Sequence, residues 1–138
     1  MSVGPVRRTL VPAAILGVMS LLLVPTSANA EGTWAQKGTT LVGSAAGDVF
    51  GASLDTDADG DTLAIGASDN DDSFTDAGQV QVFRFSEGSW SVLGSALNGV
   101  ATEDYFGTSV SLSDDGTRVA IGAPFHGAGN TGQVRVFE

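Results

Sequence analysis

A repeat in the second part of the chain constrains the fold more than any other feature of the sequence. The two copies keep one offset over most of their length, and after a loop shorter by two residues in the second copy they align again. The aligned pairs are Trp34–Gly38 with Trp90–Gly94, Asp48–Ser53 with Asp104–Ser109, Asp59-Gly60 with Asp115-Gly116, Leu63–Ala67 with Val119–Ala123, and Gly78–Phe83 with Gly132–Phe137. Internal repeats of this period indicate a modular architecture built from one repeated unit.

Each copy contains strand signals only. Asp-Gly between two β-compatible runs is a strong hairpin signal, and it occurs at Asp59-Gly60 and at Asp115-Gly116. The segments 79–85 and 133–137 alternate with period two, and no window after residue 30 has a helical period. Four short strands per copy are typical of a propeller blade. The alternatives are an antiparallel sandwich and a β-solenoid.

The sequence therefore predicts an all-β fold, a partial β-propeller of about two four-stranded antiparallel blades. We expect the first blade at about residues 48–93, preceded by an N-terminal outer strand and linker at 31–47. The second, incomplete blade is expected at about 104–138. In runs such as Ala64-Ile-Gly66 the large side chain lies on one face of the strand and the other face is almost bare. Closely packed blades require this asymmetry.

The first thirty residues have the pattern of a signal peptide. Arg7 and Arg8 precede an apolar stretch from Leu10 to Val24, and Ala28-Asn-Ala30 is a small-x-small cleavage site. The alternative is a membrane anchor, but the stretch is shorter than the ~20 apolar residues of a span. We therefore expect cleavage before Glu31 and a secreted, extracellular or cell-surface location, with no membrane span left.

These motifs resemble the FG-GAP repeat, the blade of integrin-α-like propellers and of many secreted microbial proteins. The motif residues are Phe50-Gly51 with Gly66-Ala67 in the first copy, and Phe106-Gly107 with Gly122-Ala123-Pro124 in the second. Ser68 stands in place of the proline in the first copy. The resemblance implies a propeller, usually seven-bladed, used for recognition or adhesion. The residues themselves indicate a structural role: large apolar anchors between blades, each followed by a conformationally free glycine.

Charge limits the partners. The chain has a net charge of −10, and all sixteen acidic residues follow residue 30. Nucleic acid is therefore excluded as a natural partner, and cations or basic surfaces are favoured. The chain has no cysteine, so no disulfide stabilises it.

One acidic run suggests a metal site. Asp55, Asp57, Asp59 and Asp61 alternate around Gly60, and such carboxylates are ligands that Ca²⁺ prefers. Some FG-GAP repeats carry a calcium loop between their first two strands, where this run lies. Leu63 replaces the last aspartate of that loop, and the second copy has a strand residue, Leu112, within the run. Calcium is the one cofactor that the sequence suggests, and the alternative is a solvated acidic turn.

Two loops follow the Gly-Ala segments. The first contains Asp69–Asp72 and Asp76, and the second contains Phe125 and His126. Loops on a rigid scaffold commonly carry recognition residues. His126 has no acidic or cysteine partner in its own motif. The sequence has no nucleophile elbow, phosphate loop or zinc motif, so we expect no enzymatic activity and no catalytic residue.

The predicted function is that of an exported recognition or adhesion module that binds protein or glycan through its blade-face loops. The alternatives are a fragment of a propeller enzyme and a structural protein of the cell envelope. A closed ring needs at least about four blades. We therefore expect either further blades in a longer protein or several copies assembled head to tail.

Overall fold

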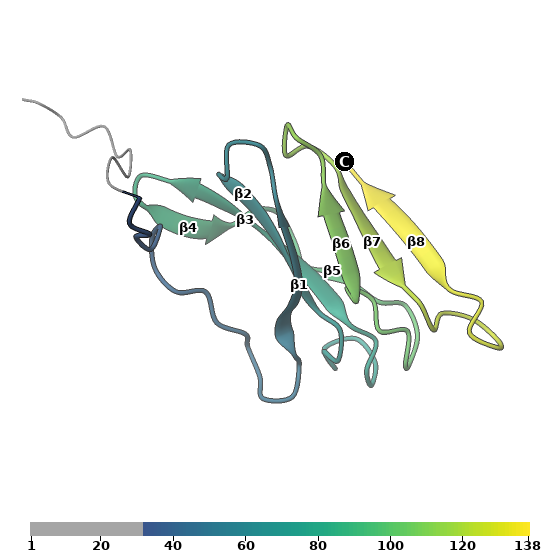
Figure 1. The fold of residues 1–138 in the computed structure, drawn as a ribbon. Coiled ribbons are helices and arrows are strands. Elements are labelled where there is room, and N and C mark those ends of the chain that lie inside the picture. Colours follow the sequence, from purple (N-terminus) through teal and green to yellow (C-terminus); the bar gives the residue numbers. More distant parts are fainter. Residues whose placement is uncertain (1–31) are drawn as a thin grey trace, which may run out of the picture. The chain divides into compact units, whose positions relative to one another are not determined.

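A computed structural model describes residues 32–138, of which residues 35–138 form one compact unit. The predicted signal peptide lies outside the described residues. The described part of the chain contains strands and no helix, and the strands form two antiparallel sheets (Figure 1). No helix among these residues is long and apolar enough to span a membrane.

The first sheet is a meander of β1 (Phe50–Thr56), β2 (Thr62–Ala67), β3 (Gln79–Ser86) and β4 (Ser89–Val92). A short strand, β5 (Leu97–Asn98), pairs with the other end of β3. The β3–β4 turn has positive φ at both Glu87 and Gly88, which suits the right-handed twist of a hairpin. The second sheet repeats the order with β6 (Ser109–Leu112), β7 (Val119–Ala123) and β8 (Gln133–Phe137).

Strand β1 begins with an irregularity at the Phe-Gly motif. Phe50 pairs with Ala67 and Ser53 with Gly66, so two residues of β1 bulge out of the ladder between them. Gly51 has a φ of 95°, and its equivalent Gly107 has a φ of 93°. Both values lie in the left-handed region, where only glycine has no steric cost. The motif glycine therefore allows the backbone turn that leads into each blade.

The two sheets pack face to face through small and β-branched side chains. The core they share consists of Ala64, Val80, Phe106, Val119, Ile121 and Ala123. Adjacent side chains in β7 lie on opposite faces of the sheet. Val119 and Ile121 therefore point toward the first sheet, while Ala120 does not. The arrangement is that of two adjacent blades of a partial β-propeller, and it confirms the predicted fold class.

The expected N-terminal outer strand is absent: residues 34–37 contain no strand. A strand needs a pairing partner, and none of the described strands pairs with this segment, which is held by side-chain contacts instead. The Trp90 indole donates a hydrogen bond to the Lys37 carbonyl at 2.8 Å, and the Lys37 ammonium lies 4.7 Å from the centre of the Phe85 ring. These contacts attach the segment to the β3–β4 hairpin.

Candidate functional site

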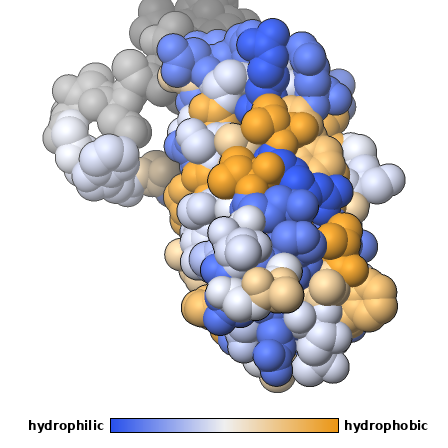
Figure 2. All heavy atoms as spheres, turned by 90° about the vertical axis from the view of Figure 1, so that its right-hand side faces the viewer, coloured by the Kyte–Doolittle hydropathy of each residue, from blue (hydrophilic) through white to orange (hydrophobic). Residues whose placement is uncertain are grey.

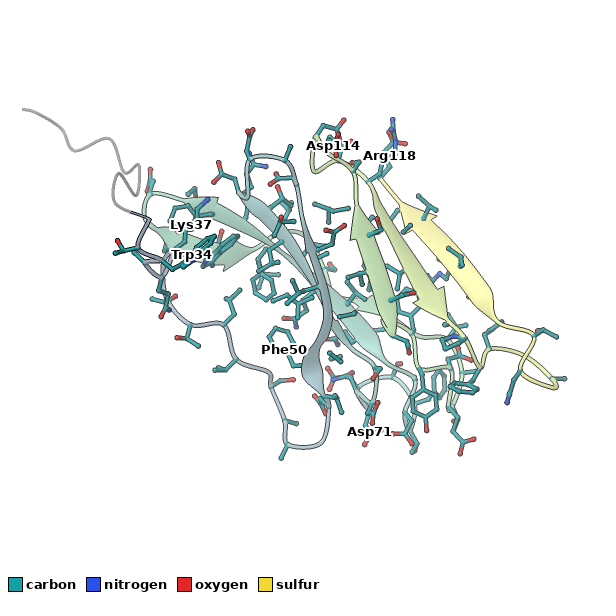
Figure 3. All side chains as sticks on the ribbon, viewed as in Figure 1. Trp34, Lys37, Phe50, Asp71, Asp114 and Arg118 are labelled. Carbon is teal, nitrogen blue, oxygen red and sulfur yellow. The ribbon has the colours of Figure 1, made fainter. Side chains whose placement is uncertain are left out.

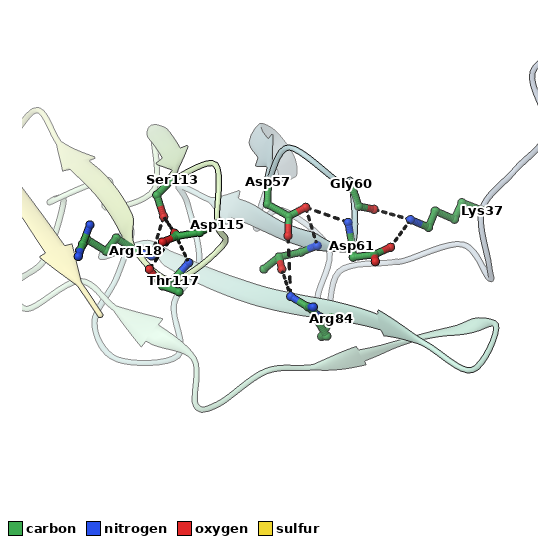
Figure 4. A network of polar contacts seen from close by, with 10 residues as sticks. Lys37, Asp57, Gly60, Asp61, Arg84, Ser113, Asp115, Thr117 and Arg118 are labelled. Carbon is green, nitrogen blue, oxygen red and sulfur yellow. Dashed lines mark hydrogen bonds and ion pairs between the residues drawn. The ribbon is translucent and has the colours of Figure 1, made fainter. Parts of the chain in front are cut away.

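The aspartates of the predicted calcium run contact different partners. The Asp61 carboxylate pairs with Lys37 at 2.6 Å, and the Asp55 carboxylate accepts a 2.7 Å hydrogen bond from the Leu112 backbone N–H. Asp57 is buried beside Arg84 at 3.8 Å, and Asp59 is exposed in the turn. No group of acidic side chains within residues 32–138 is arranged to hold a metal ion. The four carboxylates thus do not form a metal site; Figure 4 shows the partners of Asp57 and Asp61.

Asp57 instead stabilises a hairpin turn. Its carboxylate accepts hydrogen bonds from the backbone N–H groups of Asp61 and Thr62, at 2.8 and 3.1 Å. In the second copy the Ser113 hydroxyl accepts the equivalent bond from the Arg118 N–H at 3.0 Å. Burial acts to raise the pKa of Asp57, but the hydrogen bonds from Thr62 and Asp61 and the nearby Arg84 charge outweigh burial and lower it. An aspartate and a serine at the equivalent position thus both accept a hydrogen bond from the backbone of the turn. This similarity favours the interpretation of the acidic run as a turn and not as a metal site.

The opposite end of the sheets carries the loops that sequence analysis marked for recognition. Figure 3 places Asp71 at this loop end and Asp114 at the other end of the molecule. Backbone hydrogen bonds join the loops of the two blades here: the N–H groups of Glu103, Tyr105 and Phe106 donate to the carbonyls of residues 75–77, at 2.9–3.1 Å. The loop end is therefore one continuous surface built by both blades.

An aromatic pair lies in the loops of the second blade. The rings of Tyr105 and Phe125 meet edge to face, with centroids 5.3 Å apart. They line a hollow of about 400 Å³ together with backbone and polar groups of both loops of the second blade. Phe125 is exposed, as the sequence predicts for a loop tip, and Tyr105 is half-buried. We call the Tyr105–Phe125 pair and its hollow the aromatic site.

Three carboxylates lie near Tyr105, a fourth accepts a hydrogen bond from the Asp76 N–H, and none of the four has a basic partner among the described residues. We call Asp69, Asp71, Asp76 and Glu103 the acidic rim. Loss of hydration, followed by repulsion from the other three rim carboxylates, raises the pKa of Asp76 above its usual range. The Asp76 charge is in turn the largest cause of a raised pKa at Tyr105. The acidic rim thus places several negative charges close to Tyr105.

His126 has an acidic partner that sequence analysis missed. Its Nδ1 lies 3.0 Å from the Asp104 carboxylate, which is buried and also accepts hydrogen bonds from the Val100 and Ala101 N–H groups. The first copy has the equivalent contact: the Asn70 amide donates to the buried Asp48 carboxylate at 2.9 Å. Both pairs have a separation of 22 residues. The equal separation in the two copies was the signal in the sequence for this contact. Because Asn70 makes the same contact in the first copy, the contact indicates a structural role for His126.

The pKa shifts predict opposite effects at the two ends of the molecule. Hydrogen bonds from Ser113 and Thr117 lower the pKa of Asp115 to about 2, so the charged form stabilises the fold above pH ~4 and that stability is lost as the pH falls toward 2. Asp76 has a raised pKa, so its charged form destabilises the fold above its pKa. We expect Asp115→Asn to lower the Tm at pH 7 and Asp76→Asn to raise it.

Thermal unfolding of both variants from pH 2 to pH 7 measures this effect. Both differences from the wild type are expected to shrink on acidification, because the wild-type carboxylates then become neutral as well. A change of the same sign in both variants at pH 7 contradicts the assignment.

The comparisons with known proteins support the repeat. Residues 96–137 match the family model described as FG-GAP repeat. The matched segment contains β5 through β8 and includes Phe106-Gly107 and Gly122-Ala123-Pro124. The FG-GAP resemblance predicted from these residues is thereby confirmed. The comparison with curated proteins returned no match.

Proposed function

We propose that this chain is an exported recognition or adhesion module without enzymatic activity, and that it binds a basic segment of a partner protein at the aromatic site. The observation that carries the proposal is the acidic rim, a group of carboxylates unpaired with any lysine or arginine of the described residues, near the Tyr105–Phe125 pair.

The chemistry of the aromatic site suits a cation. A lysine or arginine side chain gains from the face of an aromatic ring, by about 0.5–1 kcal/mol at exposed sites. The same cation lowers the repulsion among the rim carboxylates that raises the pKa of Asp76. The hollow of about 400 Å³ accommodates one long side chain. Backbone hydrogen bonds between the blades hold the site in place before the ligand arrives, which reduces the entropic cost of binding.

Titration calorimetry with a lysine-rich peptide at low salt tests the proposal. Asp76→Asn and Phe125→Ala are each expected to weaken binding about two- to fivefold, in line with 0.5–1 kcal/mol per contact. Asp114→Asn is the matched control, because it removes the same charge from an exposed position at the other end of the molecule. Its affinity is expected to equal that of the wild type.

An equal loss in Asp76→Asn and Asp114→Asn contradicts the proposal, since the peptide then responds only to net charge. Preference for a neutral oligosaccharide over the peptide also contradicts it and favours glycan recognition through the same rings.

A further inference from the structure

The contact between the two blades shows what the face of a blade binds. The segment 94–107 leaves the first blade and lies back across it: β5 pairs with Gln79 and Val80 of β3, and the Gly107 carbonyl accepts a hydrogen bond from the Ser53 hydroxyl. Two glycines of the first blade make the approach possible. A Cβ added to Gly66 meets the Gly107 carbonyl, and one added to Gly78 meets the backbone of Phe106. Val80 is fully buried beneath this segment.

The second blade has the same face without an occupant among the described residues. Gly122, Gly132, Val134 and Ser109 stand where Gly66, Gly78, Val80 and Ser53 stand in the first blade. Here Val134 is 71% exposed, and a Cβ added to Gly122 meets only Ser109 within close range. These residues line a hollow of about 440 Å³. We call this surface the open face; Figure 2 looks from the side on which β8 lies and shows hydrophobic patches between hydrophilic ones.

The chain also carries a second copy of the occupant. Residues 38–51 are the counterpart of 94–107, and the two share an unusual backbone. Val49 and Tyr105 have φ values of 56° and 50°, and the following motif glycines have matching φ values. The aspartate directly before Val49 or Tyr105 is buried and hydrogen-bonded in both copies. Gly51 is exposed whereas Gly107 is buried, and Val42, the counterpart of Asn98 in β5, is 80% exposed.

We propose that copies of this chain associate head to tail, with residues 41–51 of one copy bound to the open face of the next. Gly51 then packs against Gly122 and accepts a hydrogen bond from the Ser109 hydroxyl, and Val42 covers β8 beside Val134. This contact has the pattern of the contact between the first blade and segment 94–107, with Gly51, Gly122 and Ser109 in place of Gly107, Gly66 and Ser53.

Charge and symmetry agree with this occupant. The residues that line the open face are all uncharged, and the one charge in residues 38–51, Asp48, is already buried and hydrogen-bonded in its own copy. Association therefore leaves no charge newly buried without a partner. The two surfaces differ, so the contact is heterologous and adds two blades per copy, which forms a closed ring where the rotation fits.

Two variants block opposite sides of the contact. Gly122→Ala places a methyl group where the Gly51 carbonyl of the preceding copy binds, by analogy with Gly66 and the Gly107 carbonyl. Val42→Asp places a charge on the other surface, at a loop position that is exposed in the single chain. We expect the wild type to self-associate in sedimentation equilibrium, and each variant alone to associate at least tenfold more weakly.

Mixing the two variants gives the decisive result. Val42→Asp keeps an intact open face and Gly122→Ala keeps an intact segment 41–51, so the mixture is expected to form a one-to-one dimer that grows no further. A wild type that stays monomeric at high concentration overturns the proposal. Variants that associate as strongly as the wild type, or a mixture that forms no dimer, also overturn it.

Discussion

Replacing Phe106 by alanine is expected to lower the free energy of unfolding by about 3–5 kcal/mol, the range for truncating a buried phenylalanine. Phe106 is 1% exposed, belongs to the core between the blades, and meets the Phe137 ring edge to face at 6.3 Å. The cavity that the substitution leaves lies between two sheets that other contacts hold in place, so the sheets cannot close it fully. Urea unfolding at pH 7 measures the change.

Phe50→Ala is the matched control, because Phe50 is the same motif residue in the first copy. It is half-buried and touches Phe83 of its own sheet. We expect a loss of about 1 kcal/mol, since less apolar area returns to water. Equal losses in the two variants contradict the assignment of Phe106 as the anchor between the blades.

Gly66→Ala is expected to destabilise the fold by about 2–3 kcal/mol, the cost of overpacking a tight site. The added methyl group meets the Gly107 carbonyl and the Ser53 hydroxyl. The backbone oxygen cannot move without separating the blades. Gly122→Ala removes the equivalent glycine of the second blade, where the methyl group meets only the exposed Ser109 side chain. That side chain can rotate away, so we expect a change within about 0.5 kcal/mol.

Thermal and urea unfolding of the two glycine variants, at concentrations low enough to keep the chains apart, measure this difference. Equal stabilities for Gly66→Ala and Gly122→Ala mean that the approach of Gly107 to the first blade is looser than described. Loss of stability in Gly122→Ala alone means that the second sheet is the more tightly packed one.

The strands could be predicted because their signals are local. Period-two alternation and the Asp-Gly turns lie within each hairpin, so β2 and β7 and their turns follow from a few neighbouring residues. The position of the Trp34–Lys37 segment could not be predicted in this way. It depends on Trp90, which comes from a different hairpin and bonds the Lys37 carbonyl.

The same distinction separates the parts of the candidate site. Phe125 and the acidic loop could be predicted, since turn residues and exposed loop positions are readable from sequence. The position of Tyr105 beside Phe125 depends on backbone bonds between loops of different blades, and the His126–Asp104 contact joins two loops as well. Asp57 was predicted to be a metal ligand because it lies in an acidic run. Its role in the turn is visible only from the backbone hydrogen bond that it accepts, which matches the one that Ser113 accepts in the second copy.

The left-handed backbone at Val49 and Tyr105 has a consequence for how such blades diversify. A β-branched or aromatic residue is unfavourable at positive φ, yet both positions keep the same conformation with unrelated side chains. What the two copies share is the buried aspartate before each position and the glycine two residues after it, so we infer that these residues hold the backbone conformation. The side chain between them is free to change during evolution without reshaping the blade. The same position can thus be varied in a binding library while the scaffold stays constant.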